Sequence, residues 1–164
     1  MWTIALLLCM VGLSHTHHCL LSPPQRTPLV GINKMMAPAC YQNTAPCGNT
    51  TASTPNLEVR AGGITRVVFE KNMAHFNKDN PGYYTISIGK EDGSLTELKR
   101  FTDPGDPAIF IYSVDVTIPA TLDASQNYIL QVKHTKNTGT GSPYLYQCAD
   151  IGVFGGSSVQ PIGK

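Results

Sequence analysis

Residues 83–88 read Tyr-Tyr-Thr-Ile-Ser-Ile, and this short stretch decides the fold. From Tyr84 onward apolar and polar side chains alternate, which is the period of a β-strand with one buried face. Residues 89–93 follow at once and are of turn-forming types, so the strand ends there. The stretch therefore predicts a strand in a sheet that covers a hydrophobic core.

Similar runs lie on both sides of this strand. Each is short, rich in β-branched and aromatic residues, and bounded by polar turns or by the breaker at 103–107. They occupy residues 64–70, 95–101, 108–118, 128–134 and 144–154. No segment of ten residues has the apolar stripe of a helix. The runs predict an all-β fold, an antiparallel β-sandwich of the immunoglobulin or fibronectin III type.

The beginning of the chain has the pattern of a secretory signal. Its apolar run from Ile4 to Leu13 is long enough for the core of a signal peptide and too short to span a bilayer. We expect residues 1–16 to be removed, 17–154 to form the domain, and 155–164 to be a flexible tail. The mature protein is then secreted into the extracellular space.

Two cleavage positions have small residues before the cut, so the mature start stays open at this point. Gly12 and Ser14 fit a start at His15, while Ser14 and Thr16 fit a start at His17 less well.

The cysteines predict disulfides but not their pairing. Four remain after the cut, an even count that fits two disulfides in an oxidising compartment, and three pairings are possible. These residues are Cys19, Cys40, Cys47 and Cys148. Residues 22–54 contain two of them, Cys40 and Cys47, and have no strand or helix period, so they predict a long, disulfide-tied N-terminal loop.

Charge and motifs exclude several functions. The formal net charge of +1, with no basic run, gives no footprint for nucleic acid or anionic lipid. The chain has no Gly-x-Ser-x-Gly, no paired zinc spacing and no phosphate-binding glycine loop, which disfavours hydrolase and nucleotide chemistry. Asn49-Thr50-Thr51 is an N-glycosylation sequon in a polar stretch, as expected of a secreted glycoprotein.

A histidine that begins the mature chain can bind one metal ion twice, through its α-amine and its ring Nδ1. A second histidine would complete a set of three nitrogens, which suits copper. We nominate His75, which lies in a loop between two expected strands. A start at His15 would instead let the amine, two backbone amides and the imidazole of His17 surround Cu(II) in a square plane. The alternative is that these histidines are incidental and solvated.

Asp150 is a candidate third ligand. It lies in the last expected strand, and a buried carboxylate is costly unless it is paired with a positive charge or a metal. The alternative is an exposed carboxylate at a strand end. His134 ends another strand, and we interpret it as a residue at the sandwich edge rather than as a ligand.

Several of these motifs together resemble one family, the fungal copper-acquisition factors and their animal relatives, which are similar in fold to lytic polysaccharide monooxygenases. The resemblance covers about residues 17–153. It rests on an early histidine before Leu20, Pro23-Pro24-Gln25-Arg26, Pro46-Cys47-Gly48, His75-Phe76-Asn77 with Asn80-Pro81-Gly82-Tyr83-Tyr84, and Tyr146-Gln147-Cys148-Ala149-Asp150.

The resemblance implies a histidine-brace copper site with His17, His75 and Asp150 as its ligands. The spacing to the Pro-Pro-x-Arg step favours His17 over His15 or His18 as the first mature residue. The resemblance also implies copper binding without oxidation of polysaccharide. A carboxylate ligand points the same way, because it favours Cu(II) and can occupy the position that oxygen needs.

We therefore expect a secreted, monomeric protein that holds Cu(II) for uptake, buffering or transfer and exchanges it with an extracellular donor or acceptor protein. It would bind no nucleic acid and not insert stably into membranes. The first alternative is a copper-dependent lytic polysaccharide monooxygenase acting on chitin or a similar polysaccharide. The second is a metal-free extracellular recognition module.

Overall fold

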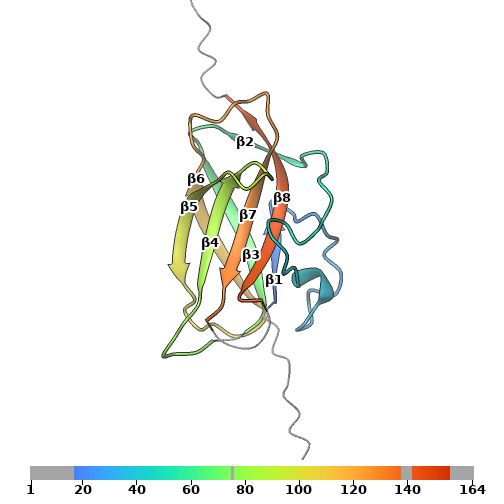
Figure 1. Cartoon of the computed structure of the whole chain (residues 1–164), viewed down its shortest axis with the longest axis vertical. Helices are drawn as coiled ribbons and strands as arrows, with labels where there is room; N and C mark the ends of the chain where they lie inside the picture. The colour runs from blue at the N-terminus through green and yellow to red at the C-terminus, as the bar shows by residue number, and fades with distance from the viewer. Residues whose placement is uncertain (1–16, 75, 138–141, 156–164) are drawn as a thin grey trace, which may run out of the picture.

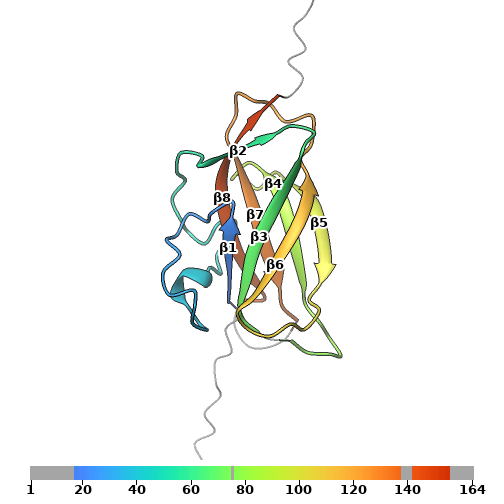
Figure 2. The same ribbon diagram turned by 180° about the vertical axis from the view of Figure 1, so that it is seen from behind.

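Two β-sheets packed face to face form the protein, as a computed structural model shows for residues 17–74, 76–137 and 142–155 (Figures 1 and 2). One sheet has the strand order β1-β3-β6 and the other the order β2-β8-β7-β4-β5. The strands are β1 His17–Ser22, β2 Leu57–Arg60, β3 Ile64–Met73, β4 Tyr83–Gly89, β5 Leu95–Thr102, β6 Phe110–Thr117, β7 Tyr128–Thr135 and β8 Tyr144–Phe154. The predicted all-β sandwich is confirmed.

All six strands expected from the sequence are present in the structure. β3 runs on to Met73 rather than ending at residue 70, and the other ends move by one or two residues. Strands β1 and β2 were not predicted. The pairing is antiparallel except for β2, which lies parallel to β8. The only helix within the described ranges is the short 3-10 helix η1, Pro38–Cys40, and no described helix is long and apolar enough to cross a membrane.

The core lies between the sheets and is built on the stretch that predicted the fold. The alternating residues Tyr84, Ile86 and Ile88 of β4 are fully buried against Phe69 of β3. An aromatic cluster continues from there, because the Phe69 and Tyr112 rings stack with their centroids 4.9 Å apart. Deleting one such buried aromatic side chain typically costs 3–5 kcal/mol, so this cluster is a large part of what holds the two sheets together.

The loop between β1 and β2 lies along the edge formed by β1 and β8 (Figures 1 and 2). Two disulfides hold it there, as the cysteine count predicted. Cys19 of β1 pairs with Cys40 of η1, and Cys47 pairs with Cys148 of β8. Residues 1–16 and 156–164 lie outside the described residues, and with them the expected signal peptide and nearly all of the expected tail.

Candidate copper site

His17 begins strand β1, at the end of the sandwich where the β3–β4 and β5–β6 connections also lie (Figure 2). Its register partner in β3 is Met73, and a β-bulge separates it from His18. The His17 residue is only 6% exposed, and its ring lies 5.0 Å, centroid to centroid, from the ring of Tyr41 in the N-terminal loop. The backbone of the first candidate ligand is therefore fixed by the sheet, and its ring packs on the loop.

His75 lies outside the described residues. Met73, two positions before it, is the residue that pairs with His17. Strand β3 therefore brings the chain to the β1 edge immediately before His75. Across the ranges 17–74, 76–137 and 142–155, no group of three or more His, Cys, Asp or Glu side chains is placed to hold a metal ion.

His18 points the other way, into the core. Its residue is fully buried, and its Nε2 donates a hydrogen bond of 2.9 Å to the Val132 carbonyl oxygen. Burial lowers the pKa of His18 to about 3, which the Val132 hydrogen bond only partly opposes, so the ring is neutral at physiological pH. Because this ring is committed to the core, His17 is better placed than His18 to serve as a ligand.

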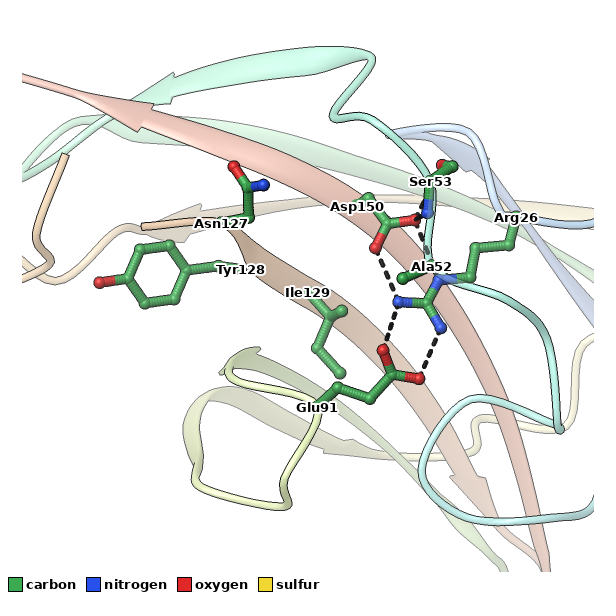
Figure 3. Close-up of a pocket in the computed structure, with 8 residues that line it drawn as sticks. All are labelled: Arg26, Ala52, Ser53, Glu91, Asn127, Tyr128, Ile129 and Asp150. Atoms are coloured by element: carbon green, nitrogen blue, oxygen red, sulfur yellow. Dashed lines mark hydrogen bonds and ion pairs between the residues drawn. The ribbon is translucent and has the colours of Figure 1, made fainter. Parts of the chain in front are cut away.

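Asp150 is buried, so the exposed alternative is wrong, and its partner is a positive charge. Arg26 Nη2 donates to its Oδ1 over 2.7 Å, and Arg26 Nε donates to its Oδ2 over 2.9 Å (Figure 3). The Ser53 backbone N–H and hydroxyl also donate to Oδ2, each over 2.9 Å. Burial by itself would raise the pKa of Asp150, but these bonds from Arg26 and Ser53 outweigh it and hold the pKa below its usual value.

The arginine of the Pro-Pro-Gln-Arg motif thus clamps three parts of the chain together. Besides Asp150, its guanidinium donates to both carboxylate oxygens of Glu91, over 2.7 and 2.8 Å, and to the Thr50 carbonyl oxygen over 3.0 Å. Arg26, Glu91 and Asp150 line a pocket of about 130 Å³, and Figure 3 shows how their side chains lie in it. The clamp joins the N-terminal loop to β8 and to the β4–β5 turn, a role that the sequence motif alone did not reveal.

The structure does not bring Asp150 to His17. Ala149 and Ile151 belong to the core, so Asp150 between them faces outward from the five-stranded sheet, beneath the loop. The part of β8 that reaches β1 is Gln147, whose Nε2 donates to the His18 carbonyl oxygen. Asp150 lies three residues further along the strand than Gln147, a distance of roughly 10 Å. This geometry counts against Asp150 as a ligand shared with His17.

His134 was expected at the sandwich edge, and that interpretation is wrong. The residue is 1% exposed, and its ring stacks on Tyr84 with the centroids 4.3 Å apart. It lies in the interior because β7 is a central strand of the five-stranded sheet.

Two solved structures with a similar fold are polysaccharide monooxygenases. A lytic polysaccharide monooxygenase important for chitin utilisation in Cellvibrio japonicus has a TM-score of 0.53 at 15% identity, covering 83% of this chain and 99% of that one. Polysaccharide monooxygenase CBM33 has a TM-score of 0.51 at 11% identity, with 84% and 100% covered. At such identities the likeness defines the fold class alone, a monooxygenase-like β-sandwich.

A cellulose-active polysaccharide monooxygenase from M. thermophila has a TM-score of 0.48 at 17% identity. The match covers 71% of this chain and 61% of the length of that enzyme. Comparison with curated proteins gives no match.

The family is shown by the sequence itself. Residues 15–162 match the family described as copper acquisition factor BIM1-like, and the chain belongs to that family. The predicted resemblance is confirmed, and a copper-related function follows from it.

Proposed function

We propose that this protein is secreted and holds one Cu(II) ion through His17 and His75, for uptake, buffering or transfer rather than for oxidative catalysis. The observation that supports the site most directly is the pairing of His17 with Met73, two residues before His75. The family supports the metal. Oxygen and nitrogen ligands with imidazole favour Cu(II), and imidazole must be neutral to bind it.

The proposal requires removal of residues 1–16. Cleavage before His17 would turn a peptide nitrogen into a primary amine beside its own imidazole, and the two could then chelate one ion. The third nitrogen would come from His75. The two disulfides support an oxidising compartment and hence secretion.

Asp150 completes the ligand set inferred from the sequence, but its two oxygens already accept four hydrogen bonds from Arg26 and Ser53. Coordination of copper would have to break this ion pair. We therefore assign Asp150 to the Arg26 clamp and keep the two histidines as ligands. The argument that a carboxylate ligand disfavours oxygen chemistry loses its basis, so the non-catalytic role rests on the family's description as a copper acquisition factor.

Copper titration of the secreted protein tests the proposal. We expect one tightly bound Cu(II) per chain, with affinity reduced by at least ~10-fold in His75→Ala and in a protein with one extra residue before His17. Lys78→Ala is the matched control, because Lys78 is exposed in the same loop and has no metal-binding role under this proposal. Undiminished affinity in both altered proteins would refute the site.

Mass spectrometry of the same preparation decides the processing. We expect the mature chain to begin at His17 and to exist as a monomer. Asn49 is exposed, and we propose that it is glycosylated. A mature start at His15 or His18, or a blocked amine, would remove the proposed chelate while leaving the fold as it is.

The alternative is a copper-dependent monooxygenase acting on chitin or a similar polysaccharide, which the shared fold with the Cellvibrio japonicus enzyme favours. Release of oxidised oligosaccharides in the presence of a reductant would establish that activity. Absence of copper binding would instead favour a metal-free recognition module.

A further inference from the structure

A buried polar cluster lies between the sheets next to β1. It consists of Lys71 of β3, Asp103 just after β5, and His134 of β7. Lys71 Nζ lies 2.7 Å from Asp103 Oδ1, and His134 Nε2 lies 3.5 Å from Asp103 Oδ2. The side chains of Lys71 and Asp103 are 0% and 1% exposed, which makes theirs the most deeply buried Lys or Arg ion pair among the described residues.

Stability alone does not account for such a pair. Removing two charges from water costs several kcal/mol per ion, and apolar replacements of similar size are often neutral or stabilising. The presence of this buried ion pair therefore needs another explanation, which its position next to β1 supplies. The His18 and His134 ring centroids are 6.4 Å apart, and Lys71 is the register partner of His18, so the cluster lies directly beneath the start of β1.

Asp103 holds the β3–β4 connection at two places. Its backbone N–H donates to the Gly82 carbonyl oxygen over 2.8 Å, immediately before β4 begins. Its Oδ1 accepts a hydrogen bond of 2.9 Å from the Gly105 N–H. Gly105 in turn packs against Phe76, because a Cβ at Gly105 would lie 2.9 Å from Phe76 Cε1. Asp103 thus connects to both ends of the described segment 76–82, to Gly82 through its backbone and to Phe76 through its carboxylate and Gly105.

The other two members of the cluster confine the same connection. Gly82 packs so tightly that a Cβ there would collide with the Thr135 carbonyl oxygen and lie 3.1 Å from His134 Nε2. Lys71 belongs to the strand that leads into the connection, and its carbonyl oxygen accepts a hydrogen bond of 2.7 Å from the Ile109 N–H. The connection is therefore held from β3, from β7 and from the segment after β5.

We propose that Lys71, Asp103 and His134 are positioning residues for the copper site. They fix the β3–β4 connection, and so set where His75 lies relative to His17, without touching the metal themselves. This inference rests on the proposed function, since it takes His75 to be a ligand. Supporting groups that orient a metal ligand typically change metal affinity by 10–100-fold when they are lost.

The test removes both charges at once, in Lys71→Met/Asp103→Leu, so that no lone charge is left buried and the Gly105 N–H loses its acceptor. The matched control is Arg66→Met/Asp115→Leu, which removes an exposed ion pair of 2.8 Å between strands β3 and β6. Three properties are measured in each protein: Cu(II) affinity, the Cu(II) EPR spectrum, and amide hydrogen exchange of the metal-free form at residues 103 and 105.

We expect the cluster variant to lose at least ~10-fold in Cu(II) affinity, to change its EPR spectrum, and to exchange both amides at least ~10-fold faster. The control should match the wild type in all three. A folded cluster variant with wild-type affinity, spectrum and exchange would overturn the proposal. If the wild type itself binds no copper, the proposed function fails, and the exchange measurement still decides whether the cluster holds the connection.

A second pair of variants covers the case in which the charge deletions prevent folding. Gly105→Ala would press on Phe76 without altering a buried charge, whereas Gly93→Ala has nothing within 4 Å of the new Cβ. Both glycines have positive φ, of 86° and 99°, so the backbone strain is matched. We expect Gly105→Ala alone to weaken Cu(II) binding. Equal affinities of the two variants would count against the proposal.

Discussion

Replacing Asp150 by asparagine separates the two roles that this carboxylate could have. Asparagine has the same shape, and its oxygen can still accept from Ser53. That oxygen, in place of Oδ2, can also still accept from Arg26 Nε, but the amide nitrogen in place of Oδ1 would face the Arg26 Nη2 donor that now lies 2.7 Å from the carboxylate. The variant therefore loses one hydrogen bond and the negative charge, and it leaves Arg26, whose side chain is 3% exposed, with only Glu91 as an anionic partner.

The expected cost follows from these contacts. Breaking a buried ion pair by removing one partner costs about 3–5 kcal/mol, and the retained Glu91 and Thr50 contacts place Asp150→Asn near the lower figure. For a domain of this size, ~3 kcal/mol lowers Tm by roughly 10 °C. Thermal unfolding of the metal-free protein, followed by circular dichroism, measures this shift. Copper affinity should stay within about 3-fold of the wild type, because the ligands proposed here are histidines.

Glu91→Gln provides the control. It removes the other carboxylate bound to Arg26, but the Glu91 side chain is 41% exposed, so its loss should cost less than ~1 kcal/mol. If Asp150→Asn instead unfolds like the wild type and binds Cu(II) at least ~10-fold more weakly, Asp150 is a ligand and the reasoning from its contacts is refuted.

Two further results are expected. Burial by itself would raise the pKa of Asp103, but its contacts with His134, Lys71 and Gly105 lower it to about 2. Asp103 should therefore contribute about 2 kcal/mol to the free energy of unfolding above pH ~4, and this contribution should be lost as the pH falls toward 2. Denaturant unfolding at several pH values measures it. A free energy of unfolding that does not change over this pH range would contradict the prediction. Removing Cys47–Cys148, which closes 101 residues, should cost about 1.4 kcal/mol more than removing Cys19–Cys40, which closes 21. The reverse order in denaturant unfolding would contradict the loop-entropy argument.

The strands that the sequence predicted are those with a clear period or a strong β composition. Strand β4 alternates and is correctly bounded at its start by Tyr83. Strand β1 could not be found in this way, because its first four residues are all buried, His18 and Leu20 by the core and Cys19 by the loop. A strand covered on both faces has no alternation, and β1 also adjoins the segment that resembles a signal peptide.

The sequence indicated that Asp150, if buried, requires a partner, but it did not indicate which partner. A buried carboxylate requires a positive charge or a metal, and both were open. Arg26 is 124 positions away in sequence, and no local pattern connects the two. The disulfide pairing could not be predicted for the same reason, since the number of cysteines does not give their distances. Such long-range partners are decided by topology rather than by composition.

The two buried ion pairs, Arg26 with Asp150 and Lys71 with Asp103, have parallel roles on opposite sides of the same sheet. Arg26 and Asp150 hold the N-terminal loop on the outer face, and Cys19–Cys40 ties that loop to β1. Lys71 and Asp103 hold the β3–β4 connection from the inner face. Under our proposal, cleavage before His17 would release an amine on a backbone already fixed by β3, opposite a connection that is itself held in place. The ligands would then lose little conformational freedom on binding copper, and this preorganisation lets two histidines and one amine bind an ion tightly.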